Sequence, residues 1–302
     1  MRSGSTLLDR VLSQVPGFVS VGEVVHIWER GLLRDELCGC GEPFSQCPFW
    51  TQVGDLAFGG WAGLDVRDVI ELQRSVDRTR WVPLMLLARD ESRYGRKLRR
   101  YADVLSRLYR GIEAASEGAV IVDSSKHAST AFLLRRVPGI RLHVVHLVRD
   151  SHGVAYSLTK KVRRPEVRSA AEYMPKATPV RSGLEWLTVN GLFHALRALG
   201  TRTTFVTYES LVTSARERIE QITRALGRQA EPAHLGFVND GVVGLTVDHT
   251  ISGNPMRFVV GDVSLRLDDA WRRDMGPVDR VVTTMLTWPL LARYGYLARG
   301  RR

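Results

Sequence analysis

The chain has 302 residues, of which 44% are hydrophobic, which suits one large domain over residues 1–302 with an ample core. Its formal net charge is +11, and only five of the 43 basic residues are lysines. No apolar run reaches the roughly 18 residues of a membrane span, and the start lacks the pattern of a signal peptide. Three cysteines are too few for a disulfide framework, so we expect a protein of the reducing cytoplasm.

Helical and strand patterns alternate along the chain. The expected helices cover 5–15, 96–115, 132–137, 152–161, 184–199 and 211–226, and the expected strands cover 18–21, 119–123, 142–148 and 203–207. Two segments lack such a pattern. We expect a cysteine-bearing loop at 34–60 and a basic, mobile loop at 163–179. The alternation predicts an α/β protein with a P-loop-like three-layer fold and a central parallel sheet.

Residues 2–8, with the sequence RSGSTLL, have the small side chains of a phosphate-binding loop. The Gly-Lys-Ser/Thr of nucleotide hydrolases is absent, so no lysine reaches a terminal phosphate and no hydroxyl holds magnesium there. Backbone N–H groups and the helix dipole can still bind a phosphate ester without a metal. The alternative is an ordinary helix N-cap. The residues predicted to bind the anion are Arg2, Ser3, Gly4, Ser5, Thr6 and Leu7.

A phosphate loop normally follows a strand, yet only Met1 precedes Arg2. The first, central strand is therefore missing from the recorded start. Either an upstream segment is absent from this sequence or the sheet has lost a strand. We expect the former, because removal of a central buried strand would expose its neighbours.

Polar residues follow three predicted strands, at the edge where parallel sheets bind ligands. They include Lys126 after the second strand, Arg149 after the third and Tyr208 after the fourth. Arg149 precedes Ser157 by eight residues, so a strand-end arginine and a helical hydroxyl can converge on one phosphate. The alternative is a surface arginine and a serine that merely faces its helix.

Together, the RSGSTLL loop, Arg149 with Ser157, and the Tyr208-Glu209 segment resemble the sulfotransferases that use 3′-phosphoadenosine-5′-phosphosulfate (PAPS). The resemblance covers about residues 2–260 and is to a bacterial type, closer to the tyrosylprotein and carbohydrate branch than to the cytosolic branch. It implies that the first loop binds the 5′-phosphosulfate. It also implies that Arg149 and Ser157 bind the 3′-phosphate and that Tyr208 lies near the adenine.

The resemblance further implies an anion contact nearer the C-terminus. Residues 249–258 are the candidate loop, with Arg257 on the 3′-phosphate and Ser252 or Asn254 assisting. This loop does not reproduce the Gly-rich, lysine-ended version of the cytosolic sulfotransferases. The alternative is an ordinary Gly-Asn-Pro turn.

Three residues are candidates for catalysis. Glu23 resembles the acidic residue of the tyrosylprotein branch, and partial burial would raise its pKa and suit a general base. Its alternative role is to interact with a helix dipole. Lys126, assisted by Arg2, is expected to stabilise the leaving phosphate. His127 is the rival base, because cytosolic sulfotransferases use a histidine shortly after a lysine in this region.

The three cysteines, Cys38, Cys40 and Cys47, could bind zinc together with His26. Their spacing is not that of a recognised zinc finger. We therefore expect a thiol-bearing loop or one disulfide, and we assign no metal ligands.

The sequence thus predicts an enzyme that moves a sulfuryl group from PAPS to an acceptor hydroxyl by in-line transfer that requires no metal. The expected acceptor is a small-molecule, lipid or glycan hydroxyl, held near Trp28 and the two loops. We expect no nucleic-acid partner and no membrane span. The alternatives are a P-loop small-molecule kinase, which would depend on magnesium, an arginine-rich nucleic-acid-binding protein, and a folded but inactive fragment.

Overall fold

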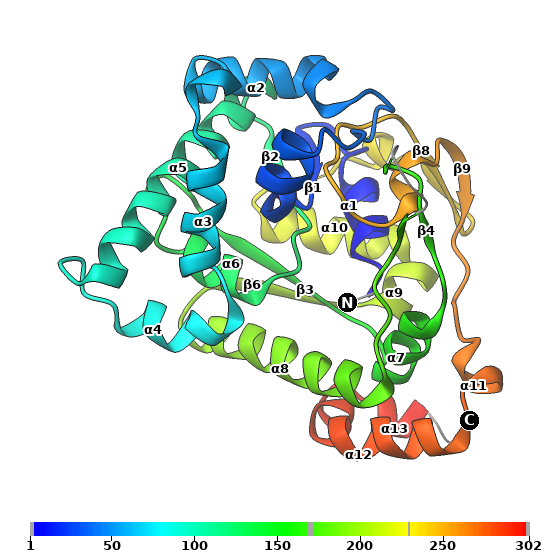
Figure 1. The fold of residues 1–302 in the computed structure, drawn as a ribbon. Coiled ribbons are helices and arrows are strands. Elements are labelled where there is room, and N and C mark those ends of the chain that lie inside the picture. Colours follow the sequence, from blue (N-terminus) through cyan, green and yellow to red (C-terminus); the bar gives the residue numbers. More distant parts are fainter. Residues whose placement is uncertain (1–2, 168–171, 229, 300–302) are drawn as a thin grey trace.

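Two parallel pairs of strands lie at the centre of the computed structural model, which describes residues 3–167, 172–228 and 230–299 (Figure 1). Strand β1 (Phe18–Gly22) pairs with β2 (Val120–Asp123), and β3 (His143–Val148) pairs with β6 (Arg202–Thr207). All four predicted strands are therefore confirmed. Within the described ranges each pair forms its own two-stranded sheet, and no strand is hydrogen-bonded to both pairs.

Helices cover both faces of the β3–β6 pair. Val206 packs against α1 (Ser5–Leu12) and its neighbours, whereas the adjacent Phe205 packs with Trp186 of α8 (Pro179–Ala198) on the opposite face. This alternation is expected because successive side chains of a strand point to opposite sides. Figure 1 shows α8 running along one side of these strands and α10 (Ala215–Ala225) along the other. The predicted layering is confirmed.

The largest apolar core lies between β1 and a group of helices in the first half of the chain. These helices are α2 (Pro48–Phe58), α3 (Val66–Val76), α4 (Val82–Leu87), α5 (Arg93–Ala115) and α6 (Ala128–Leu134). Trp28 is fully buried there and donates a hydrogen bond to the hydroxyl of Tyr101 at 3.0 Å. Trp28 itself is therefore a core residue, and the expectation that the acceptor is held in the region around it stays a prediction.

Several predicted boundaries need correction: the helices expected at 132–137 and 184–199 begin earlier, at Ala128 and Pro179, and two other segments differ more. The expected loop at 34–60 contains helix α2, which begins at Pro48 and buries Trp50 and Val53 on one face. In the sequence, the flanking cysteines and glycines hide the apolar pattern of this face. The expected helix at 211–226 is two helices, α9 (Tyr208–Thr213) and α10, separated at Ser214. The side chain of Thr207 caps α9 and moves its start to Tyr208.

The rest of the chain adds elements that the sequence patterns did not predict. The basic segment forms a short antiparallel pair, and part of it lies outside the described residues. None of the described helices is both long and apolar enough to cross a membrane. The helix expected at 152–161 is α7 (Ser151–Thr159), and the elements without a predicted counterpart are α11 (Trp271–Asp274), α12 (Pro277–Arg293), α13 (Tyr296–Arg299), β4 (Arg163–Arg164), β5 (Glu172–Tyr173), β7 (Val238–Asn239), β8 (Val242–Leu245) and β9 (Gly261–Ser264).

One long connection returns from β8 to the central strands before β9 begins. We call residues 246–260 the return loop. Arg10 of α1, which is fully buried, donates hydrogen bonds to Asp248 at 2.9 Å and to the carbonyl of Met256 at 2.9 Å. Ile251 forms a parallel bridge with Gly22 at the end of β1. The return loop is therefore fixed against the carboxyl end of β1.

Candidate functional site

Glu23 lies where β1 ends, at the edge predicted to bind ligands. Its backbone N–H donates to the carbonyl of Ile251 at 2.7 Å. The preceding Gly22 has φ +72°, and a Cβ there would lie 2.4 Å from that same carbonyl oxygen, so only glycine allows this approach. The strand and the return loop thereby position the Glu23 carboxylate, which is only 8% exposed.

Four side chains surround the Glu23 carboxylate, and we call these five residues the Glu23 cluster. Lys126 donates a hydrogen bond to Oε1. The hydroxyl of Ser252 and Nε2 of His26 each lie 3.5 Å from Oε2, and Arg30 donates to the Ser252 hydroxyl. The structure therefore brings together three predicted site residues, Glu23, Lys126 and Ser252.

The electrostatics of the Glu23 cluster favour an ionised carboxylate. Burial raises the pKa of Glu23, but the charge and hydrogen bond of Lys126 outweigh this effect, and the pKa falls below its ordinary value. The expected raised pKa is therefore wrong in direction. Burial, followed by the charge of Arg30, lowers the pKa of His26 to about 3, so its imidazole is neutral at pH 7. Glu23 is thus in the form that can accept a proton.

Two members of the Glu23 cluster have unusual backbone conformations. Lys126 has φ +63° and Ser252 has φ +57°, both in the left-handed region. Such a conformation costs on the order of 1 kcal/mol for a residue with a side chain, and it persists where the surroundings impose it. For Lys126 the surroundings include Asp123, whose Oδ1 accepts from the N–H of Ser125 at 2.8 Å. The turn after β2 therefore aims the lysine at Glu23.

The predicted phosphate loop is the start of α1. Gly4 is its N-cap, with φ +87°, and a Cβ there would lie 2.6 Å from Cδ2 of Tyr208. The ring of Tyr208 thus lies directly against the loop, and the Arg149 guanidinium lies 4.5 Å from the centre of that ring. Gly4, Tyr208 and Arg149 were predicted from three separate motifs, and the structure brings them together.

The return loop connects this phosphate loop to the Glu23 cluster. The hydroxyl of Thr6 accepts a hydrogen bond from the N–H of Asn254 at 3.4 Å. A Cβ on Gly253 would lie 3.6 Å from that hydroxyl and 3.5 Å from Glu23 Oε1. Gly253 therefore lies between the two groups of predicted residues. Among the other loop residues, Ser3 is buried and Arg2 lies outside the described residues.

Arg149 is buried at the end of β3, as predicted, and holds a carboxylate. Its Nη2 donates to the carboxylate of Asp268 at 2.9 Å and to the carbonyl of the same residue at 2.7 Å. The indole N–H of Trp186 donates to the Arg149 carbonyl at 3.0 Å and fixes the backbone. Ser157 is buried on α7, the helix that follows β3, which agrees with the predicted placement.

Arg257 and His127 occupy less expected places. The Arg257 guanidinium is 1% exposed and donates to the carbonyls of Thr250 at 2.5 Å and Leu37 at 2.6 Å. It joins the return loop to residues 34–47, which we call the cysteine segment, and its contact with a 3′-phosphate stays a prediction. His127 is exposed at the start of α6, with its ring edge-on to that of His26 at 5.8 Å. The choice between Glu23 and His127 as base also stays open.

Two residues of the Glu23 cluster were missed by the sequence analysis. His26 was considered only as a zinc ligand, whereas its ring contacts Glu23 and His127. Arg30 lies on a π-helix, η2 (Ile27–Leu33), which follows the short 3-10 helix η1 (Val24–His26). π-Helical turns are rare and often occur at functional sites, and no local sequence pattern announces them.

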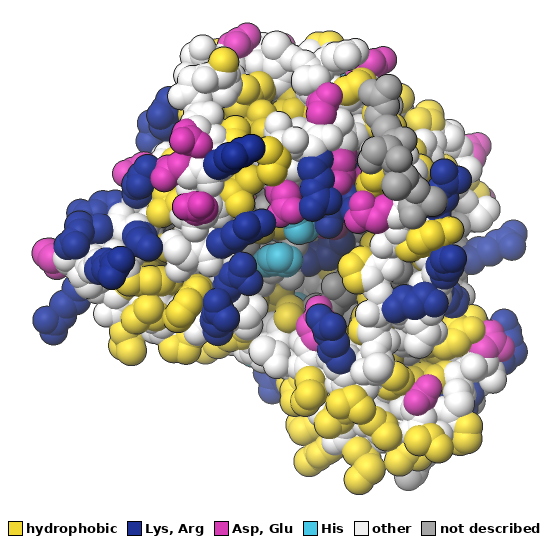
Figure 2. All heavy atoms as spheres, in the orientation of Figure 1, with side chains coloured by type: hydrophobic (Ala, Val, Ile, Leu, Met, Phe, Trp, Pro, Cys, Tyr) yellow, Lys and Arg dark blue, Asp and Glu magenta, His cyan; other side chains and the backbone are white. Residues whose placement is uncertain are grey.

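The surface around this region is hollowed. Figure 2 shows a depression near the centre of this face, between the upper helices and α8, in which histidine and basic side chains lie. Acidic side chains border it from above. A polar opening of this kind suits an anionic ligand together with a hydroxyl-bearing one.

The chain resembles two solved sulfotransferase domains. One, from the curacin biosynthetic pathway, matches over 96% of this chain and 94% of its own, with 16% identity and a TM-score of 0.50. The other, from the Synechococcus PCC 7002 olefin synthase, matches over 96% and 90%, with 21% identity and a TM-score of 0.49. No family model and no curated protein match the chain. The likeness to the curacin-pathway domain shows that this chain has the α/β fold of a sulfotransferase domain, as predicted.

Proposed function

We propose that this protein is a sulfotransferase that transfers a sulfuryl group from PAPS to an acceptor hydroxyl. The observation that carries the proposal is that Gly4, Tyr208 and Arg149 lie close together, beside the Glu23–Lys126 pair. An anion-binding loop, an aromatic ring and an arginine thus lie next to an ionised carboxylate and a lysine. The fold of a sulfotransferase domain supports the same conclusion.

The start of α1 is suited to the 5′ end of the donor. The first N–H groups of a helix have no partner within it, and Gly4 adds no side-chain cap. The described first turn contains no acidic side chain that would repel an anion. Arg149 and Ser157 would hold the 3′-phosphate, and Tyr208 would contact the nucleoside. Arginine and hydroxyl groups bind phosphate through charge-assisted hydrogen bonds.

The Glu23–Lys126 pair supplies the groups that the transfer step needs. The acceptor oxygen forms a bond to sulfur while the bond from sulfur to the bridging phosphate oxygen breaks. The acceptor proton passes to Glu23, which the low pKa keeps ionised. Lys126 and the α1 N–H groups stabilise the negative charge on the departing adenosine 3′,5′-bisphosphate, so charge neutralisation needs no metal ion.

The acceptor is proposed to enter through the depression above α8 and to present its hydroxyl to Glu23. Besides Lys126 and the Ser252 hydroxyl, the described side chains near the carboxylate include Arg30, His26 and the exposed His127. They suit a small-molecule, lipid or glycan hydroxyl with polar neighbours.

Calorimetric titration without magnesium tests this function. We expect adenosine 3′,5′-bisphosphate to bind at least 10-fold more tightly than AMP, because only the bisphosphate engages Arg149. Arg149→Ala should remove that preference, whereas Arg67→Ala, which changes an exposed arginine on α3, should leave it unchanged. Magnesium-dependent ATP binding would instead indicate a kinase. Steeply salt-dependent binding to nucleic acid without bisphosphate binding would contradict the proposal.

A further inference from the structure

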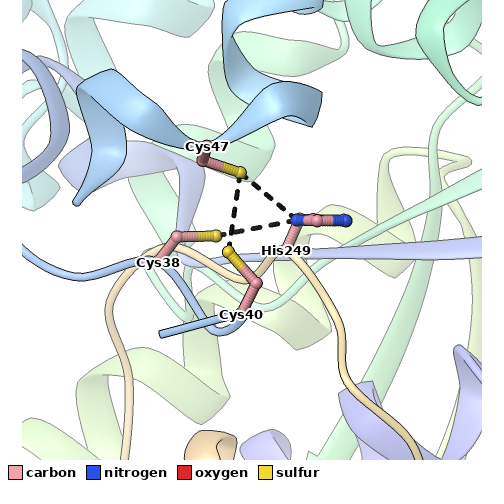
Figure 3. Close-up of side chains that lie close together, drawn as sticks. All are labelled: Cys38, Cys40, Cys47 and His249. Atoms are coloured by element: carbon pink, nitrogen blue, oxygen red, sulfur yellow. Dashed lines mark hydrogen bonds between the residues drawn. The ribbon is translucent and has the colours of Figure 1, made fainter. Parts of the chain in front are cut away.

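A second group of side chains with coordinating atoms lies on the cysteine segment and the return loop. Cys38, Cys40, Cys47 and His249 place three sulfur atoms and one imidazole nitrogen within 4.8 Å of one another (Figure 3). In Figure 3 all four side chains point toward a common centre. Cys38 and Cys47 are buried, and the other two residues are partly buried. Neither the expected transfer step nor the anion-binding loop uses these residues.

Three of the distances among these atoms lie within 0.4 Å of those of a tetrahedral zinc site. Cysteine sulfur lies about 2.3 Å from zinc and histidine nitrogen about 2.0–2.1 Å, so a tetrahedron places two sulfurs about 3.8 Å apart and sulfur and nitrogen about 3.6 Å apart. Cys40 and Cys47 sulfurs are 3.8 Å apart. The His249 Nδ1 is 3.2 Å from the Cys47 sulfur and 3.9 Å from that of Cys38.

A disulfide does not account for this arrangement. All three cysteines are free thiols, so of the two expected alternatives this structure has the thiol-bearing loop and not the disulfide. A disulfide would use two of the sulfur atoms. It would not explain why the third cysteine and the histidine also point to the same place. The histidine is also not the one expected from the sequence, because His249 takes the place that we considered for His26.

The surroundings hold each ligand in position. The His249 ring stacks on Phe49 at 5.2 Å, with 12° between the ring planes. The indole N–H of Trp50 donates to the His249 carbonyl at 2.8 Å. The N–H of Cys38 donates to the carbonyl of Glu42 at 2.8 Å, which closes the turn that carries the first two cysteines. Aligned ligands supported by a second layer of contacts are typical of protein metal sites.

We propose that Cys38, Cys40, Cys47 and His249 form a structural zinc site. Four protein ligands leave no open position for a substrate, which distinguishes a structural site from a catalytic one. The ion would join the cysteine segment to the return loop. His249 precedes Ser252 by three residues, so this link would also fix the part of the loop that contacts Glu23. The ion therefore supports the site without taking part in the transfer.

Metal analysis of the full chain tests the proposal. Protein purified with a reducing agent and zinc, and without chelator, should contain about one zinc per chain. Replacement by Co²⁺ should give the intense thiolate-to-cobalt absorption and the visible bands of tetrahedral cobalt. His249→Ala and Cys47→Ala should each lower the zinc content at least fivefold. His234→Ala, which changes a histidine of the 3-10 helix η6 (Pro232–Leu235), should not.

The wild-type measurements decide the matter even if a variant fails to fold. Reduced, folded protein that takes up neither zinc nor Co²⁺ would overturn the proposal. So would thiols that react with a disulfide reagent equally fast with and without zinc, because coordination protects thiolates. Retention of stoichiometric zinc by folded His249→Ala and Cys47→Ala variants would place the ion elsewhere. None of these results depends on whether the protein binds PAPS.

Discussion

The proposed site contains two carboxylate–cation pairs that differ in which partner is fixed. In the Glu23–Lys126 pair the carboxylate is the more buried member, and it is fixed at the end of a strand. In the Asp268–Arg149 pair the arginine side chain is 8% exposed, whereas the carboxylate is 40% exposed. Asp268 also lies on a segment without helix or strand, between β9 and α11.

In the proposed function this difference separates a reacting group, Glu23, from a replaceable one, Asp268. A cation neighbour lowers the pKa of both carboxylates against the effect of burial, so both are charged at neutral pH. Glu23 is held by several neighbours and cannot leave without disturbing β1 and the return loop. We propose that the more exposed Asp268 moves aside and that a ligand phosphate takes its place on Arg149.

The largest effect is expected from removal of the Glu23 charge. Glu23→Gln should lower kcat by about 100-fold or more, because the loss of a general base typically costs 10²–10⁴. The Kd for adenosine 3′,5′-bisphosphate should change little. Sulfate transfer to an accepted hydroxyl measures the first quantity, and calorimetry measures the second. Glu71→Gln, on the exposed face of α3, is the matched control.

His127→Ala decides the assignment of the base. If His127→Ala abolishes transfer while Glu23→Gln remains active, the histidine is the base and Glu23 only positions Lys126. If both variants are slow, the pH dependence of each will show which group must be deprotonated for transfer.

A smaller effect concerns acid stability near Glu23. His26 has a pKa of about 3 in the folded protein and about 6.5 when unfolded. Between these values the unfolded chain binds more protons, so the free energy of unfolding falls as the pH falls. From pH 7 to 5 the expected loss is about 2 kcal/mol. Burial also lowers the pKa of His146, to about 4, so urea denaturation should show a larger total loss in wild type, and His26→Gln should reduce that loss by about 2 kcal/mol.

The smallest effect is expected at Asp268. Asp268→Asn removes the charge that a bound phosphate must displace, so the affinity for adenosine 3′,5′-bisphosphate should rise a few-fold, equivalent to roughly 1 kcal/mol. Asp262→Asn changes an exposed aspartate of β9 and should have no effect. Weaker binding after Asp268→Asn would mean that the carboxylate orients Arg149 rather than competing with the ligand.

The sequence predicted the parts of the fold that local patterns determine. Apolar runs identified all four central strands, and polar residues after them located Lys126, Arg149 and Tyr208 at one edge. Helix α2 was missed because its burial depends on partners such as α5 rather than on its own periodicity. The sequence also could not show that β2 and β3 belong to separate pairs in the described structure.

The site was predicted less completely, because its charges depend on distant contacts. Nothing near residue 23 in the sequence indicates that Lys126 approaches Glu23, so burial alone suggested a raised pKa for this carboxyl. The charge of Lys126 instead lowers the pKa of Glu23. The fourth member of the cysteine group, His249, lies more than 200 positions from Cys47, whereas His26 was the nearer choice in the chain. Only the return loop, held by Arg10, brings these residues together.

A crystal structure of the complex with adenosine 3′,5′-bisphosphate tests the central claim most directly. The account predicts the 5′-phosphate at the N–H groups that begin α1, near Lys126, and the 3′-phosphate on Arg149 with Asp268 displaced. The Tyr208 ring should contact the nucleoside. A bisphosphate bound elsewhere, or one that leaves the Arg149–Asp268 pair intact and the start of α1 without a phosphate, would contradict it.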